Sequence, residues 1–144
     1  MVVLQSKLRG KAQCMNTEIQ KYNATQSEQD SIICEKLMGI IDKHLNFTER
    51  KIWHAHPVWF INGNPIVGYS KQKDCVKLLF WSGVDFDEKE LQPGSGKFKD
   101  ASKRYISKDE IIESDIKRWL DKSEKIQWDY KNIVKRKGKL KRIK

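Results

Sequence analysis

The fold of this protein is decided by residues 53–82, which read WHAHPVWFINGNPIVGYSKQKDCVKLLFWS. Three runs of β-branched and aromatic residues alternate here with short polar segments, which is the pattern of antiparallel strands joined by hairpins. The spacing predicts strands over residues 58–61, 66–70 and 75–81. Residues 62–65, Asn-Gly-Asn-Pro, are expected to form the first turn, because Asn and Gly tolerate positive φ and proline cannot donate to a strand ladder. Residues 71–74 are expected to form the second turn.

The last of these strands indicates how the sheet is covered. Side chains alternate along a strand, so one face would carry Val76, Leu78 and Phe80. The opposite face would carry Cys75, Lys77, Leu79 and Trp81. Because a lysine lies among them, we expect this second face to be only partly covered, as in an antiparallel sheet with helices on one side.

Two capping boxes predict the main helices. Thr25 with Glu28 would open a helix over residues 26–44, whose apolar residues recur at helical spacing. Ser107 with Glu110 would open a second helix over residues 108–122, which is expected to bury Ile111, Ile112, Ile116, Trp119 and Leu120. The remaining elements expected are a short helix over 17–22, a strand near 103–106 and a helix within 126–134 that ends at Gly138. The fold class is therefore α+β.

Length and composition describe one small domain. The chain has 144 residues, of which 38% are hydrophobic and 33% charged. No run approaches the roughly 18 apolar residues that span a bilayer, and no signal peptide is evident. Three widely spaced cysteines without a CxxC pair favour reduced thiols, so we expect a cytoplasmic protein without membrane contact. We divide the chain into a flexible extension over 1–14, a domain over 15–134 and a basic tail over 135–144.

Positive charge is concentrated at the C-terminal end. The net charge is +10, and residues 122–144 hold ten Lys and Arg against two acidic residues, which gives +8. Such runs bind phosphates by releasing counterions, and aromatic residues just upstream can stack on bases. The candidate nucleic-acid-binding residues are Trp128, Tyr130, Lys135, Arg136, Lys137, Lys139, Lys141 and Arg142. A tail that only keeps the protein in solution is the alternative.

Two clusters are candidates for a metal site. His54 and His56 would point to the same side if they lay on a strand, as two metal ligands do. The segment after the third strand holds Asp85, Asp87, Glu88 and Glu90. Carboxylates suit hard cations, although acidic residues at the start of a helix have the same appearance. No cofactor is expected.

No catalytic motif appears in the sequence. It contains no GxSxG, no HExxH and no cysteine with an evident histidine partner. A binding role is therefore favoured over an enzymatic one. The residues expected to form a shallow aromatic groove on the open sheet face are Trp59, Tyr69, Lys77 and Trp81.

Several short motifs resemble the YdhG-like family of small bacterial domains of unknown function. They are His56-Pro57, Asn62-Gly63, Val67-Gly68-Tyr69, Phe80-Trp81-Ser82-Gly83 and the segment 126–140. The likeness extends over residues 17–142 and implies a two-layer α+β fold, with helices packed on one face of a curved antiparallel sheet. Some relatives are labelled frataxin-like iron chaperones. Proteins of that kind display many acidic residues, whereas this chain is basic and offers only residues 85–90 as a counterpart.

Three functional hypotheses follow from these observations. The first is a non-enzymatic module that binds a protein or a small molecule on the aromatic sheet face. The second is nonspecific binding of nucleic acid or another anion by the C-terminal segment. The third is an iron or divalent-cation chaperone that uses the acidic cluster, with His54 and His56.

Overall fold

A single open antiparallel sheet is the centre of the fold. The computed structural model describes residues 18–144, so the extension expected over 1–14 lies outside the described residues. Within them, six strands lie in the order β1-β2-β3-β4-β6-β5. Their bounds are β1 Glu49–Trp53, β2 His56–Ile61, β3 Asn64–Lys71, β4 Val76–Phe80, β5 Gln92–Pro93 and β6 Ala101–Tyr105. The helices are α2 Glu28–His44 and α3 Glu113–Lys125, with a further helical turn over residues 18–24.

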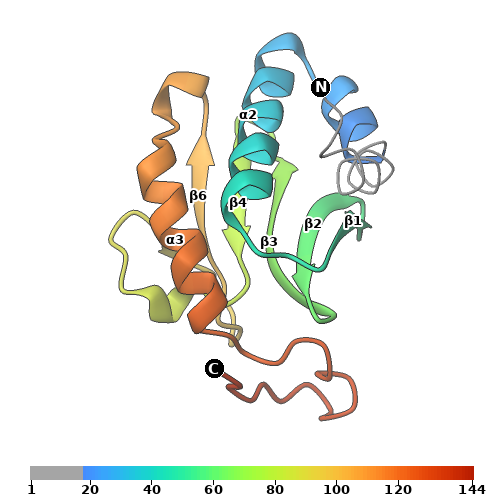
Figure 1. The fold of residues 1–144 in the computed structure, drawn as a ribbon, viewed down its shortest axis with the longest axis vertical. Coiled ribbons are helices and arrows are strands. Elements are labelled where there is room, and N and C mark those ends of the chain that lie inside the picture. The colour runs from blue at the N-terminus through green and yellow to red at the C-terminus, as the bar shows by residue number, and fades with distance from the viewer. Residues whose placement is uncertain (1–17) are drawn as a thin grey trace, which may run out of the picture.

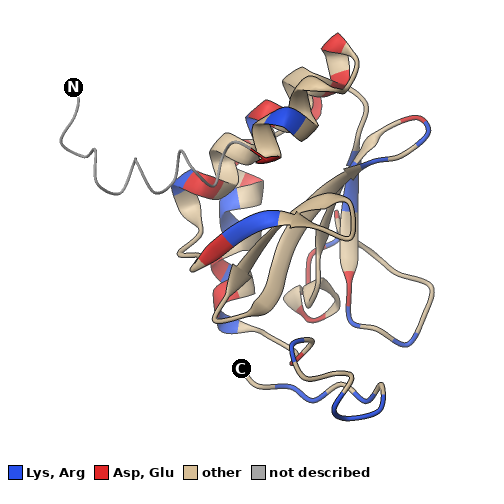
Figure 2. Ribbon diagram, turned by 90° about the vertical axis from the view of Figure 1, so that its right-hand side faces the viewer, with Lys and Arg blue, Asp and Glu red and all other residues tan. Residues whose placement is uncertain are grey.

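The helices cover one face of the curved sheet (Figure 1), which gives the molecule two layers. In the side view of Figure 2 the sheet separates the helical layer from a face that no helix covers. The predicted α+β fold class is therefore confirmed. Among the described residues, no helix is both long enough and apolar enough to cross a membrane.

The first four strands are joined by short turns, and the first two of these turns contain residues with positive φ. Between β2 and β3 the turn consists of Asn62 and Gly63, with φ of 50° and 86°. The turn expected over 62–65 is shorter than predicted, because Asn64 and Pro65 already pair within β3. A register shift between Trp59 and Phe60 accommodates the proline, which has no N–H for the ladder.

Strand β1 was not predicted from the sequence. Its residues, ERKIW, lack a long apolar run, and the strand pairs along its whole length with β2. The turn between them holds His54 and Ala55 at φ of 51° and 72°. Neither residue is a glycine or an asparagine, so the usual hairpin signal is missing from the sequence.

Both main helices begin later than predicted. The side chain of Ser27, not Thr25, caps α2 by accepting a hydrogen bond from the backbone N–H of Asp30. The capping box of Ser107 and Glu110 is present, but it opens a short 3₁₀ turn over Lys108–Glu110. Because α3 starts only at Glu113, Ile112 is 55% exposed instead of buried.

The helix expected within 126–134 is wrong. Residues 126–144 form turns beneath one end of the sheet (Figure 1), and Gly138 adopts a φ of 86° inside them. The segment folds back on itself, because Trp128 bridges to Arg142 and the N–H of Asp129 donates to the carbonyl of Lys141 at 2.7 Å. The end of the basic segment therefore lies alongside residues 127–129.

The core lies between the sheet and the helices. Its largest buried side chains are Trp59, Trp119, Tyr69, Tyr105, Phe80 and Phe86. Val76, Leu78 and Phe80 face this core, as the alternation along β4 predicted. Cys34 and Cys75 are buried thiols.

Candidate functional site on the open sheet face

The structure divides the four predicted groove residues between two faces. Lys77 and Trp81 lie on the open face, where both are partly exposed. Trp59 does not line the pocket on this face, and its ring belongs to the core. Tyr69 is among the residues that line the pocket, although its ring also packs in the core. The indole N–H of Trp59 donates to Asp42 at 2.8 Å, and the hydroxyl of Tyr69 donates to Asn23 at 2.6 Å. The pairing register explains the error, because it puts Val58 and Gly68 on the open face instead.

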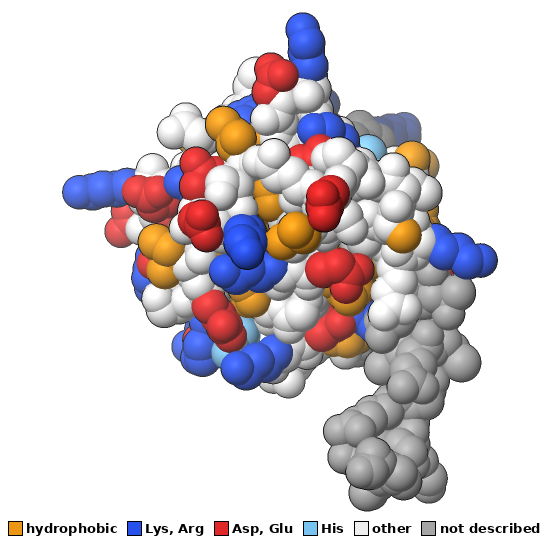
Figure 3. Space-filling model, turned by 90° about the horizontal axis from the view of Figure 1, so that it is seen from above, with side chains coloured by type: hydrophobic (Ala, Val, Ile, Leu, Met, Phe, Trp, Pro, Cys, Tyr) orange, Lys and Arg blue, Asp and Glu red, His pale blue; other side chains and the backbone are white. Residues whose placement is uncertain are grey.

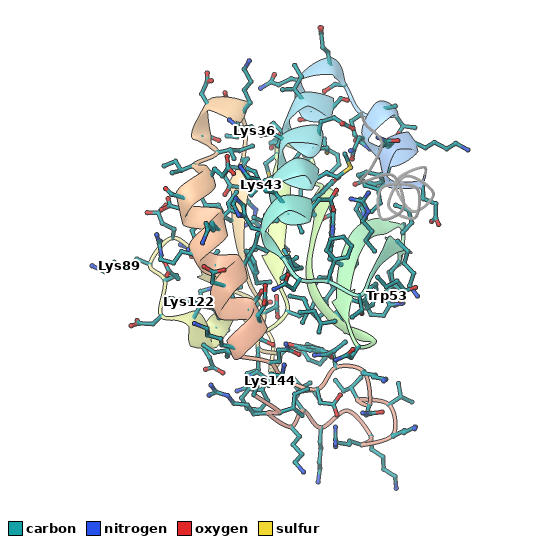
Figure 4. The ribbon with its side chains drawn as sticks, viewed as in Figure 1. Lys36, Lys43, Trp53, Lys89, Lys122 and Lys144 are labelled. Carbon is teal, nitrogen blue, oxygen red and sulfur yellow. The ribbon has the colours of Figure 1, made fainter. Side chains whose placement is uncertain are left out.

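A pocket of about 160 Å³ lies on the open face, over strands β1 to β4. It is lined mainly by Trp53, Val58, Gly68, Lys77, Leu79 and Trp81, with His54 and His56 at its edge. The residues come from four adjacent strands and the first turn, because β1 to β4 are neighbours in the sheet. In Figure 4 the labelled Trp53 marks its position beside β1 and β2.

Gly68 forms the floor of the pocket. A Cβ at this position would lie 2.5 Å from the carbonyl oxygen of Pro57 and 3.3 Å from the ring of Trp81. No larger residue fits without moving the backbone of β2. The hollow beside the aromatic walls therefore exists because the strand carries a glycine at this point.

The aromatic walls are held by other rings. The ring centroids of Trp53 and Trp81 are 6.1 Å apart, with their planes inclined by 47°. The ring of Phe60 packs edge-on against Trp53 at 5.4 Å, and the ammonium of Lys51 lies 5.0 Å from the centroid of Phe60. Both tryptophans are only partly buried, so they keep apolar surface open to a ligand.

The polar side chains that line the pocket are those of Lys77, His54, His56 and Ser70. Among the described residues the ammonium of Lys77 has no hydrogen bond or ion pair. The buried Nδ1 of His56 has no hydrogen-bond partner there either. Burial, followed by the nearby His54, lowers the pKa of His56 below its ordinary 6.5. The lowered pKa favours the neutral imidazole of His56, and the ammonium of Lys77 brings a positive charge to the pocket.

The histidine pair does not have the expected arrangement. His54 lies in the turn between β1 and β2 at positive φ, so strand alternation does not aim both imidazoles to one side. The ring of His54 packs against that of Trp53, with the centroids 4.3 Å apart. In the part of the chain that the structure describes, no three His, Cys, Asp or Glu side chains come together to hold a metal ion.

Three of the four carboxylates of the acidic cluster are bound by other parts of the fold. Asp85 accepts a hydrogen bond from the indole of Trp128 at 2.6 Å. Glu88 accepts from Arg118 at 2.8 Å and from Lys122 at 2.5 Å, and the Arg118 guanidinium lowers the pKa of Glu88 to about 2. Glu90 pairs with Lys103, while Asp87 is an exposed residue in the left-handed region. Glu88 therefore ties α3 to residues 85–90, and Asp85 ties the C-terminal segment to them.

The C-terminal aromatics anchor the basic segment to the sheet. The hydroxyl of Tyr130 donates to the backbone carbonyl of Trp81 at 2.7 Å, and the backbone N–H of Trp128 donates to the hydroxyl of Ser82 at 2.9 Å. Arg136 pairs with the buried Asp129. The side chains of Lys135, Lys137, Lys139, Lys141 and Arg142 are not paired with any carboxylate of the described chain. In Figure 2 the loop at the bottom of the ribbon is coloured mainly for Lys and Arg and for uncharged residues.

Sequence reasoning missed Trp53 and Gly68 as pocket residues, and it placed Leu79 on the open face without including it in the groove. Gly68 carried a usable signal, because a glycine inside a strand marks a bulge or a close approach. Trp53 could not be placed without knowing that residues 49–53 form a strand.

Comparisons of the chain with known protein families, with curated proteins and with solved structures find no match. The resemblance to the YdhG-like family therefore stays a prediction.

Proposed function

We propose that the protein is a binding module whose open sheet face takes up a planar aromatic ring that carries a negative charge. The observation that carries the proposal is the hollow over Gly68, which the adjoining rings of Trp53 and Trp81 both line. An apolar cavity of roughly 150 Å³ accommodates a benzene ring. A pocket of about 160 Å³ with two indoles in its lining thus takes one ring, and the second ring of a bicyclic ligand such as indole or adenine would extend over the open face.

The charge preference rests on Lys77. Within residues 18–144 its ammonium has no carboxylate partner, and none of the described acidic residues lines the pocket. A carboxylate, phosphate or sulfonate on the ligand would form a charge-assisted hydrogen bond with it. A cationic ligand would meet an uncompensated like charge.

The hydrogen bonding of the hydroxyl that lines the pocket, that of Ser70, favours binding over nucleophilic catalysis. Ser70 lines the pocket, and its oxygen accepts a hydrogen bond from Gln72 Nε2 at 2.9 Å. Among the described residues it has no imidazole partner to remove its proton.

The test compares two ligands that share a ring and differ in charge. The indole N–H signals of the protein are followed by NMR during titration with indole-3-acetate and, separately, with tryptamine. We expect indole-3-acetate to shift the signals of Trp53 and Trp81 and to leave those of the buried Trp59 and Trp119 in place. Equal shifts with tryptamine, or no shifts at millimolar indole-3-acetate, would reject the proposal.

Two variants locate the binding. Lys77→Gln keeps most of the length of the side chain and removes its charge, so it should abolish the preference for indole-3-acetate over tryptamine. Lys73→Gln is the matched control, because Lys73 is an exposed lysine in the turn before β4 and does not line the pocket. A preference that survives Lys77→Gln would contradict the role given to Lys77.

A further inference from the structure

We propose that the natural ligand of this face is single-stranded nucleic acid, with one base in the pocket and the following nucleotides leading onto the basic C-terminal segment. This inference rests on the proposed function, since the base would be the planar ring and its phosphate the negative charge. It adds a second surface, the segment 126–144, and a polymeric partner.

Three hollows follow one another across the open face. The pocket over Gly68 shares Leu79 and Trp81 with a second hollow of about 360 Å³, which is lined further by Phe98, Asp100, Tyr130 and Ile133. Phe98 in turn lines a third hollow of about 400 Å³, together with Lys97, Lys99, Trp128, Gly138, Lys139 and Leu140. A path therefore runs from β1 to the C-terminal segment through shared residues.

Aromatic surface is available along this path. Phe98 is 43% exposed, and its ring lies 6.3 Å from that of Tyr130. The ammonium of Lys99 lies 4.7 Å from the ring centroid of Trp128 and covers part of it. Every base has a flat π-face, so rings spaced along a groove bind successive bases without reading their sequence.

Positive charge accompanies the rings. Residues 126–144 contain a single acidic residue, Asp129, which is 4% exposed and already paired with Arg136. The outer surface of this segment therefore presents cations. Asp100 is the acidic residue that lines the path, and its carboxylate lies against Gly94. On the surface seen from above in Figure 3, by contrast, acidic and basic side chains are interspersed.

The combination favours a single strand over a duplex. The bases of a duplex are already stacked on one another and show only their edges, so they cannot enter a pocket sized for one ring. An acidic protein would complement the cations but would leave the aromatic path unused.

The experiment measures the fluorescence anisotropy of a labelled single strand, as oligodeoxyadenylate and as oligoadenylate, with the full chain over a range of salt concentrations. Phe98→Ala removes a stacking surface at an exposed position, so it should weaken binding by about 5-fold to 150-fold without changing the salt dependence. Ile112→Ala, which removes exposed apolar surface on the helical side, is the control and should bind as the parent does.

A charge variant tests the C-terminal segment. Lys139→Glu with Lys141→Glu should reduce the slope of log affinity against log salt by about 0.7 for each phosphate that these lysines no longer neutralise. Lys21→Glu with Lys73→Glu changes the net charge equally at exposed positions elsewhere, so it should leave most of the affinity in place. A fold check by circular dichroism accompanies each variant.

The outcomes separate this inference from the proposed function. If indole-3-acetate shifts the Trp53 and Trp81 signals but no oligonucleotide binds, the inference is overturned and the proposed function stands. Oligonucleotide binding that depends on Lys139 and Lys141 but not on Phe98 would show that the segment attracts phosphates only through its charge. That result would overturn the proposed path of stacked bases. A duplex of equal length that binds as tightly would also overturn it, whereas binding of either sugar type that weakens in Phe98→Ala supports it.

Discussion

The side-chain oxygen of Asn64 accepts a hydrogen bond from the backbone N–H of Tyr130 at 2.9 Å, across 66 positions of sequence. The same oxygen accepts from the N–H of Lys131 at 3.1 Å, and the side-chain nitrogen donates to the carbonyl of Trp128 at 3.0 Å. Asn64 is 3% exposed. One buried amide therefore satisfies three backbone groups of a segment that has no helix or sheet ladder of its own.

Replacing this amide should loosen the C-terminal segment. We expect Asn64→Ala to lower the free energy of unfolding by about 2 kcal/mol, because buried backbone groups would be left without partners. The amide protons of Tyr130 and Lys131 should exchange much faster, which hydrogen-exchange NMR measures directly. Asn62→Gly is the control, since glycine suits its positive φ. Unchanged protection at Tyr130 in Asn64→Ala would show that other interactions hold the segment.

Glu88 should make stability depend on pH in the acid range. Its side chain is 8% exposed, and the guanidinium of Arg118 lowers its pKa from 4.5 to about 2. A depressed folded-state pKa stabilises the protein above the unfolded pKa, and this contribution is lost as the pH falls from about 4.5 to about 2. Glu88→Gln should therefore cost about 2 kcal/mol at pH 7, after allowance for solvent screening, and flatten the stability curve in that interval.

Urea unfolding followed by circular dichroism at neutral and acid pH checks the role of Glu88. Glu90→Gln is the matched control, because Glu90 pairs with Lys103 at an exposed position and should change the curve far less. Equal effects of the two substitutions would contradict the assignment.

Gly68 and Gly39 should respond in opposite directions to the same substitution. A Cβ on Gly39 would meet no atom within 4 Å, so Gly39→Ala within α2 should stabilise the protein by about 0.5–1 kcal/mol. Gly68→Ala should destabilise it, because the methyl group would press on the Pro57 carbonyl. The midpoint of urea unfolding measures both. A stabilising Gly68→Ala would show that the pocket floor has room to spare.

Asp42 connects α2 to two strands. It accepts hydrogen bonds from the indole of Trp59 and from the guanidinium of Arg50, which is 2% exposed. Asp42→Asn keeps an acceptor for Trp59 and should cost about 1–3 kcal/mol. Asp42→Ala removes both acceptors and should cost more. Thermal unfolding compares them with Asp74→Asn, an exposed control on the turn before β4; a neutral Asp42→Ala would contradict this role.

Regular periodicity made most of the fold predictable from the sequence. The alternation in β4 placed Val76, Leu78 and Phe80 on the core side, and the helical stripe gave α2 to within two residues at its start. The start of α2 was ambiguous because the sequence offers two residues that could cap the helix. Thr25 and Ser27 are both good caps, and only the structure shows that the hydroxyl of Thr25 donates to the carbonyl of Tyr22.

The candidate site was only half predictable, for a physical reason. Which of two alternating residues faces the core depends on strand register, and no short motif shows that Tyr69 pairs with Leu78 or that Trp59 pairs with Val67. The simple alternation that works for β4 therefore cannot assign Trp59 or Tyr69 to a face. The C-terminal segment was misread because its apolar residues have helical spacing, whereas its backbone groups bond to Asn64 and to the segment itself.

The order of the strands has a consequence for how fast this chain reaches its native state. Strands β1 to β4 lie side by side in the order of synthesis, so each can pair with its predecessor through a local turn. The hydrogen bonds of Asn64 with residues 128–131 close a much longer loop and are expected to form after the rate-limiting barrier. Stopped-flow kinetics of Asn64→Ala should then show faster unfolding with nearly unchanged refolding. Slower refolding would place this amide in the folding nucleus instead.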